Sequence, residues 1–218
     1  MIAVAFSYKC RTEQMQRPGQ QMSLAHSDKG WTNSSWMRPA EQVMLAAVDG
    51  KTRVVGIISP QSASGVSTLC QMVAECYSRS GQQTLLADFT LPVITGNKRA
   101  WVPGENPLEE TRADPRGYDT FSVQATVATR SQYNSVDKLR HFFNEDLSGY
   151  KAIIVDLPAI LERREDSINP LAAARACDVV IMVCMTGRIK QQQVKLALAE
   201  LALAGVQIGG TVLNDALN

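Results

Sequence analysis

Residues 54–68 constrain the fold of this chain more than any other stretch, because they combine a buried strand, a loop of small residues and the start of a helix. The strand, from Val54 to Ile58, contains only apolar residues and glycine, which is typical of a strand buried on both faces of a parallel sheet. The loop that follows is small, polar and turn-forming, and apolar residues at helical spacing begin at Leu69. Such a unit presents backbone N–H groups and the positive end of a helix dipole to an anion such as phosphate.

The loop nearly matches the P-loop, which ends in Gly-Lys-Ser/Thr; its lysine contacts the terminal phosphates and its hydroxyl binds Mg²⁺. Here the corresponding residues are Gly65, Val66 and Ser67, followed by Thr68. A hydrogen bond to a charged group contributes about 1.5–3 kcal/mol, so the lysine's absence should weaken triphosphate binding by about ten- to a hundredfold. We therefore predict that these four residues belong to a degenerate nucleotide site.

Two carboxylates close apolar runs further along the chain. Residues 83–88 and 151–158 are both expected to form buried strands, the first ending in Asp88 and the second reaching Asp156 near its end. Ligands of open α/β sheets bind beyond the carboxyl ends of the strands, and an aspartate in that position binds Mg²⁺ in P-loop proteins. Asp88 and Asp156 therefore join the predicted site, with Ser67 and Asp156 as metal ligands if a nucleotide binds. The alternative for Asp88 is a local turn.

Alternating strands and helices predict an α/β domain with a parallel sheet covered by helices on both faces. Residues 7–37 are polar and poor in aliphatic side chains, and residues 1–37 are predicted to form an N-terminal arm or linker before a domain that spans 38–218. Residues 96–117, rich in glycine, proline and charge, are expected to form a long surface segment. The other expected elements are strands at 121–128, 178–183 and 206–213, and helices at 39–48, 135–147 and 188–204.

The composition excludes several classes of protein. A net charge of +1 over 218 residues argues against a large nucleic-acid interface. No apolar run approaches the roughly 18–20 residues of a membrane span and no signal peptide is recognisable, so we expect a cytoplasmic protein. The five cysteines include no C-x-x-C pair, which favours reduced thiols over disulfides or a zinc site.

The order of these motifs resembles the bacterial tyrosine kinases and related ATPases of capsule and exopolysaccharide export, which are relatives of the MinD/ParA group. The resemblance runs from about Pro39 to Asn214. It implies a P-loop NTPase-like fold, a site for Mg-ATP or Mg-ADP and, at Asn214, a residue that recognises adenine. The residues that carry it are 55–61 with 65–68, then 84–88, 150–158 and 209–214.

This chain departs from that family at the positions on which the family's activity and assembly depend. Val66 replaces the phosphate-binding lysine, and Gln61 stands at the position of the second, signature lysine of the MinD/ParA group. Asp88-Phe89-Thr90 has one carboxylate where the family usually has two. The arginines of the family's oligomerising helix and its C-terminal tyrosine cluster have no counterparts, whereas the apolar strands are intact.

This pattern favours a pseudoenzyme without catalytic residues, acting as a scaffold or regulator of a membrane protein for polysaccharide chain length or export. Such a protein would reach the inner membrane only through its partner and would need no cofactor beyond weakly bound Mg-ATP or Mg-ADP. A homodimer is the symmetric assembly to expect.

Two alternatives stay open. One is a binding switch of the MinD/ParA type that holds ATP or ADP weakly through the loop amides, Ser67, Asp156 and Asn214. The other is an active tyrosine autokinase or ATPase whose missing cation comes from Lys98 or Arg99 in the segment 96–117. Binding of Mg-ATP separates the first from the scaffold, and turnover that depends on Asp88 or Asp156 identifies the second.

Overall fold

The computed structural model describes residues 9–10, 40–41, 43, 52–90, 111–122, 134–162 and 168–216. They build one eight-stranded sheet with the strand order β1-β8-β7-β2-β6-β3-β5-β4, in which only the β4–β5 pair is antiparallel. The strands are β1 (Lys9–Cys10), β2 (Val54–Ile58), β3 (Thr84–Asp88), β4 (Arg112–Ala113), β5 (Asp119–Ser122), β6 (Ala152–Asp156), β7 (Val179–Thr186) and β8 (Ile208–Ala216). The helices are α2 (Val66–Arg79), α4 (Val136–His141), the π-helical turn η2 (Phe142–Asp146), α5 (Pro170–Ala176) and α6 (Gln191–Leu203).

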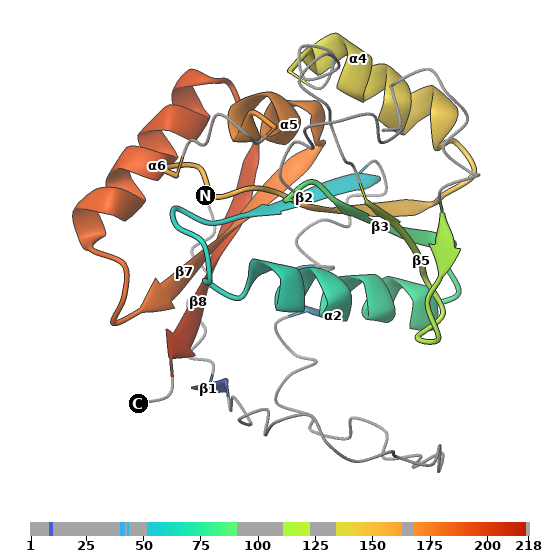
Figure 1. The fold of residues 1–218 in the computed structure, drawn as a ribbon, viewed down its shortest axis with the longest axis horizontal. Helices are drawn as coiled ribbons and strands as arrows, with labels where there is room; N and C mark the ends of the chain where they lie inside the picture. The colour runs from blue at the N-terminus through green and yellow to red at the C-terminus, as the bar shows by residue number, and fades with distance from the viewer. Residues whose placement is uncertain are drawn as a thin grey trace, which may run out of the picture.

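Helices cover both faces of the sheet, α2 on one face and α4, α5 and α6 on the other (Figure 1). Side chains alternate between the two faces along each strand, so β2 sends Val55 and Ile57 towards α2 and Val54 and Ile58 towards the opposite layer. We call the first set of buried apolar residues the α2-side cluster; it includes Val55, Ile57, Val66, Leu69, Cys70, Leu86, Ile154, Ile181 and Val212. This three-layer arrangement confirms the predicted fold class.

The central elements lie where the sequence predicts them. β2 has the predicted bounds, while β3 and β6 are one to three residues shorter than the apolar runs that predict them. Helix α5 was not predicted from the sequence. Asn169 caps it, and Pro170 occupies its first turn. The helix expected at 135–147 changes at Phe142 into η2, whose buried Phe142 and Phe143 pack together.

Several expectations fall largely outside the described residues. Within the arm of residues 1–37 only β1 is described, and it pairs in parallel with the end of β8. The domain boundary at residue 38 and the cations Lys98 and Arg99 therefore stay predictions. The strand expected at 121–128 begins earlier, at Asp119, and is described only as far as Ser122.

Two partly described segments agree with their predictions as far as they can be followed. Of the helix expected at 39–48, Ala40, Glu41 and Val43 are described and are helical. In the segment 96–117, residues 111–117 are described; they contain the exposed strand β4 and a turn closed by Asp114 and Arg116.

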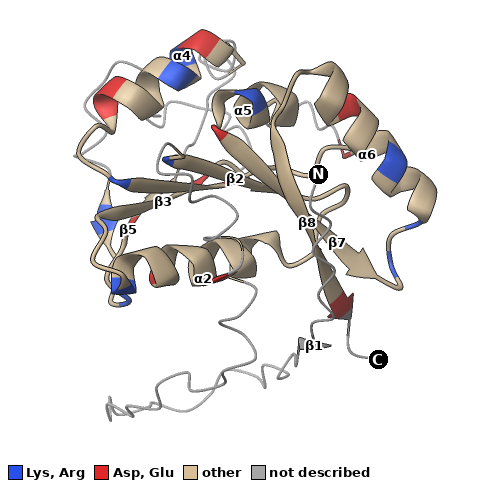
Figure 2. Ribbon diagram, turned by 180° about the vertical axis from the view of Figure 1, so that it is seen from behind, with Lys and Arg blue, Asp and Glu red and all other residues tan. Residues whose placement is uncertain are grey.

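Charged side chains lie on the helices and near the ends of the strands (Figure 2). No helix among the described residues is long and apolar enough to cross a membrane. Cys70, Cys76, Cys177 and Cys184 are buried free thiols, as the sequence predicts. The side chain of Cys10 lies outside the described part.

Candidate nucleotide site at the loop between β2 and α2

The ends of three strands bring the predicted polar residues to the face of the sheet that α2 covers. Asp88 follows Leu86 by two positions, Asp156 follows Ile154 and Asn214 follows Val212; all three of these apolar residues belong to the α2-side cluster. Because side chains two apart on a strand share a face, the two aspartates and Asn214 point to the same side. Asp88 and Asp156 are also direct register partners on β3 and β6. We call these two residues the acidic pair.

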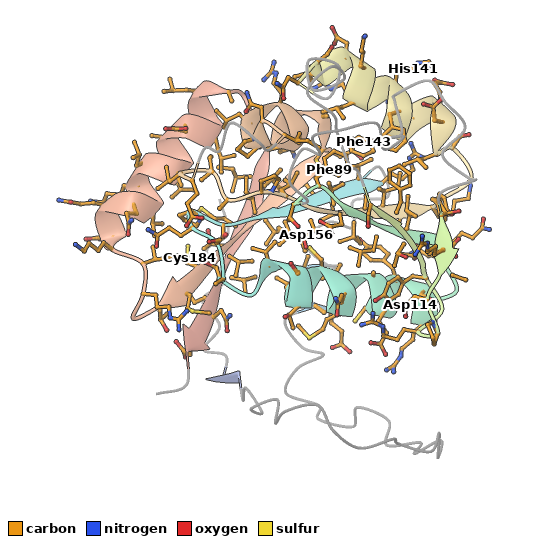
Figure 3. All side chains as sticks on the ribbon, in the orientation of Figure 1. Phe89, Asp114, His141, Phe143, Asp156 and Cys184 are labelled. Carbon is orange, nitrogen blue, oxygen red and sulfur yellow. The ribbon has the colours of Figure 1, made fainter. Side chains whose placement is uncertain are left out.

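Asp156 is the buried member of the acidic pair, with 5% of its surface exposed. It lies between the sheet and α2 (Figure 3) and forms a side-chain hydrogen bond with Ser67. The pKa of Asp156 is raised to about 6, mainly by burial; the Ser67 hydrogen bond lowers it and the charge of Asp88 contributes to the rise. Its Oδ1 atom is buried and has no hydrogen-bond partner among the described residues. No lysine or arginine of the described chain offsets this concentration of negative charge.

Two neighbours define the surroundings of the acidic pair. Cys70 is completely buried one turn after Ser67, and burial, followed by the charges of Asp156 and Asp88, raises the pKa of its thiol. Thr90 donates to Asp88 Oδ1 from its backbone N at 2.8 Å and from its hydroxyl at 2.6 Å. Asp88 therefore closes a local turn, the alternative that the sequence left open, and also faces Asp156.

The loop itself keeps its shape through internal hydrogen bonds. The hydroxyls of Ser59 and Ser64 both donate to the carbonyl oxygen of Gln61, at 2.5 and 2.7 Å. Both serines are buried, and the two hydrogen bonds are partly buried. Gly65 at the start of α2 has a φ of +88°, a conformation that side chains disfavour, and Ala63 adopts a φ of +56° despite its Cβ.

Asn214 holds one side of the loop. Its Nδ2 atom donates to the carbonyl oxygen of Ser64 at 2.9 Å, in a buried hydrogen bond that links residues 150 positions apart. A Cβ on Gly65 would lie 2.5 Å from the same Nδ2 atom, so this close approach requires glycine. The Oδ1 atom of Asn214 is buried without a hydrogen-bond partner in the described part of the chain.

The segment after β6 holds the other side. The backbone N–H groups of Ile160 and Leu161 donate to the carbonyl oxygens of Ser59 and Pro60, at 3.0 and 3.1 Å. The next residue, Glu162, accepts a hydrogen bond at Oε1 from the backbone N–H of Ser62, also at 3.0 Å. Glu162 was not predicted from the sequence; its signal there is an acidic residue shortly after the strand that carries Asp156.

The position of the missing lysine is part of the core. Val66 is 8% exposed and belongs to the α2-side cluster, whereas Ser67 and Thr68 are exposed on the first turn of α2. Compared with the lysine that the sequence resemblance implies at this position, valine brings no charge to the loop and adds an apolar contact to the layer between α2 and the sheet.

No family model matches the chain. A Staphylococcus aureus protein, CapB, whose name describes it provisionally as a tyrosine-protein kinase, is 26% identical in an alignment of 189 residues; the match covers 79% of this chain and 79% of CapB. The kinase domain of the Escherichia coli tyrosine kinase ETK superposes with a TM-score of 0.67 at 18% identity, over 84% of this chain and 74% of that domain. The chain is a homologue of CapB with the fold of bacterial tyrosine-kinase domains.

The tyrosine-kinase fold extends to the MinD ATPases, as the sequence resemblance implies. The Pyrococcus horikoshii MinD complexed with Mg-ADP superposes with a TM-score of 0.56 at 16% identity, over 74% of this chain and 70% of that protein. That MinD structure therefore holds a magnesium nucleotide on the fold that this chain shares.

The residues fit the metal better than the phosphates. The Ser67 hydroxyl and the orphaned Oδ1 of Asp156 are oxygen ligands of the kind that Mg²⁺ prefers. Val66 offers no positive charge to the terminal phosphates of a nucleotide, and the backbone N–H of Ser62 in the loop already donates a hydrogen bond to Glu162. Val66 therefore supplies no charge that could stabilise phosphoryl transfer.

Proposed function

We propose that this chain is a catalytically inactive relative of the bacterial tyrosine kinases that serves as a scaffold or regulator in an exopolysaccharide chain-length or export complex. The single observation that carries the proposal is the position of Val66 in the α2-side cluster. An aliphatic side chain packed under the phosphate loop stabilises the fold and contributes nothing to transition-state charge.

The loop contacts support the same proposal. Glu162, Asn214 and the two buried serines satisfy polar groups of the loop with groups of the chain itself. A loop that is shaped by its own protein keeps its form without nucleotide, which suits a scaffold whose surface must stay constant.

The polysaccharide assignment rests on the sequence resemblance and on CapB as a relative. The expected partner is a membrane protein of chain-length control or export, which would hold this protein at the inner membrane. Co-purification of the chain with the cytoplasmic part of such a protein from the same organism tests this assignment, and a catalytically active tyrosine kinase of that organism serves as the reference partner.

Weak binding of Mg-ADP or Mg-ATP as a switch is the second candidate. Two observations favour it, the buried Oδ1 atoms of Asp156 and Asn214, which have no hydrogen-bond partner in the described chain. A metal at the first and a donor group of a base at the second would satisfy both. The active-kinase alternative depends on Lys98 or Arg99, which lie outside the described residues.

Titration calorimetry with Mg-ATP tests the inactive scaffold. We expect no binding heat at high micromolar nucleotide from the natural protein. Val66→Lys should bind about ten to a hundred times more tightly than the natural chain if the loop is otherwise sound. Val66→Met is the matched control, because it changes size without adding charge and should bind no better. Low-micromolar binding or measurable turnover by the natural protein would overturn the proposal.

A further inference from the structure

The segment that follows β6 places the carboxylate of Glu162 against the phosphate loop. β6 ends at Asp156, and four and five residues later the backbone N–H groups of Ile160 and Leu161 are hydrogen-bonded to the loop carbonyls of Ser59 and Pro60. These two bonds place the next side chain, that of Glu162, beside the middle of the loop. Its Oε1 atom then accepts the N–H of Ser62 at 3.0 Å.

A carboxylate on a loop amide imitates a bound phosphate oxygen. Both are anionic oxygens, and both accept from backbone N–H groups near the N-terminus of a helix, where the helix dipole favours negative charge. A hydrogen bond from an amide to a charged acceptor is stronger than one between neutral groups. The carboxylate is also attached to the chain, so its effective concentration at the loop is high without any ligand in solution.

We propose that Glu162 is a built-in occupant of the phosphate loop, which holds the Ser62 amide and thereby excludes the oxyanion of a phosphate from that position. This inference deepens the proposed function and rests on it, because it explains how an inactive loop keeps its shape. The ligand class that the side chain displaces is an inorganic phosphate or the phosphate of a nucleotide, and the common feature of the two is the oxyanion.

The first test follows the Ser62 amide without any ligand. Hydrogen exchange of Ser62 in Glu162→Ala should be about tenfold faster than in the natural protein, the factor expected from the loss of one hydrogen bond. Glu162→Gln retains an acceptor but loses the charge, so its exchange rate should fall between the two. Glu145→Ala, which changes an exposed glutamate in η2, is the matched control and should leave the Ser62 rate unchanged. Equal Ser62 exchange in Glu162→Ala and the natural protein would overturn the proposal.

The second test adds inorganic phosphate and ADP separately. In Glu162→Ala, millimolar phosphate should slow Ser62 exchange again, whereas in the natural protein it should have no effect. If ADP slows exchange and phosphate does not, the displaced ligand is the nucleotide; if both do, the loop recognises the oxyanion alone. If neither ligand slows exchange in Glu162→Ala, the exclusion half of the proposal is wrong.

Failure of this inference can be told apart from failure of the proposed function. Tight Mg-ATP binding by the natural protein would contradict the inactive scaffold. The effect of Glu162 on Ser62 exchange is measured without nucleotide, so its outcome does not depend on that result. Circular dichroism of each variant checks that the fold is intact, and Glu162→Gln remains informative if the alanine variant is unstable.

Discussion

Asn214 donates from Nδ2 to the carbonyl oxygen of Ser64 at 2.9 Å, and this contact joins the last strand of the sheet to the loop after β2. The bond is buried, and Ser64 is 3% exposed, so water has little access to replace the lost donor. The residue that the family resemblance assigns to adenine recognition therefore also supports the loop itself.

Asn214→Ala should destabilise the protein by about 1–3 kcal/mol, because it leaves the buried Ser64 carbonyl without its donor. Asn214→Asp keeps the shape, cannot donate and buries a charge, so it should cost at least as much at neutral pH. Urea unfolding measures both. Asn144→Ala is the control, since its hydrogen bond to Arg53 is exposed, and it should change stability by no more than about 0.5 kcal/mol. A cost for Asn214→Ala as small as that of the control would contradict the supporting role.

The buried carboxyl of Asp156 should make stability depend on pH in an unusual direction. Its pKa in the folded protein is about 6, above its ordinary value of 3.8, so near pH 5 the folded chain holds a proton that the unfolded chain has released. The contribution of Asp156 to stability is therefore fully present below its ordinary pKa of 3.8 and is lost as the pH rises through about 6 towards 7, a total change of about 3 kcal/mol.

Asp156→Asn removes this titration, and the variant should gain stability relative to the natural protein as the pH rises from 4 to 7. Urea unfolding at several pH values measures the difference, which should be flat above pH 7. A difference between Asp156→Asn and the natural protein that stays constant over this range would show that Asp156 titrates normally.

Replacing Ala63 by glycine should make the folded protein more stable. Its φ of +56° costs an alanine about 1–2 kcal/mol, whereas glycine avoids that strain and loses about 0.5–1 kcal/mol through the entropy of the unfolded chain. Ala63→Gly should therefore stabilise the protein by about 0.5–1 kcal/mol. Ala202→Gly, at an exposed position in α6, should destabilise it by a similar amount, and thermal unfolding of the pair gives the comparison. Destabilisation by both substitutions would contradict the loop conformation.

Substitution by phenylalanine should have opposite effects on stability at two buried tyrosines, Tyr118 and Tyr150. Burial raises the pKa of Tyr118 and of Tyr150 to about 12 in each case. The Tyr118 hydroxyl is buried without a hydrogen-bond partner in the described residues, while Tyr150 donates to Asp119 Oδ2 at 2.8 Å. Tyr118→Phe should be neutral or stabilising by up to about 1 kcal/mol, and Tyr150→Phe should cost about 1–3 kcal/mol. Equal losses in urea unfolding would indicate that Tyr118 has an unrecognised partner.

The central strands were predictable because their side chains are buried on both faces, which leaves continuous apolar runs in the sequence. Val54–Ile58, and the runs that end at Asp88 and Asp156, are of this kind, and their bounds differ from the structure by at most a few residues. Helix α5 was not predicted, because its run of alanines carries little periodic signal and its start depends on the Asn169 cap. The short strands β1 and β4 exist only through pairing with β8 and β5, which local sequence does not reveal.

Local sequence determined that this chain has a strand, a loop of small residues and a helix, that a carboxylate lies at or near the end of each of two further apolar runs, and that valine stands where the sequence resemblance implies a lysine. These features depend on residue type and spacing, which are read directly from the chain. Only the tertiary structure decided that Val66 is packed in the core, that Asp156 is buried beside Asp88, and that Glu162 and Asn214 hold the two sides of the loop. Burial and hydrogen bonding between residues about 100 and 150 positions apart depend on how the strands are ordered in the sheet, and no local pattern encodes that order.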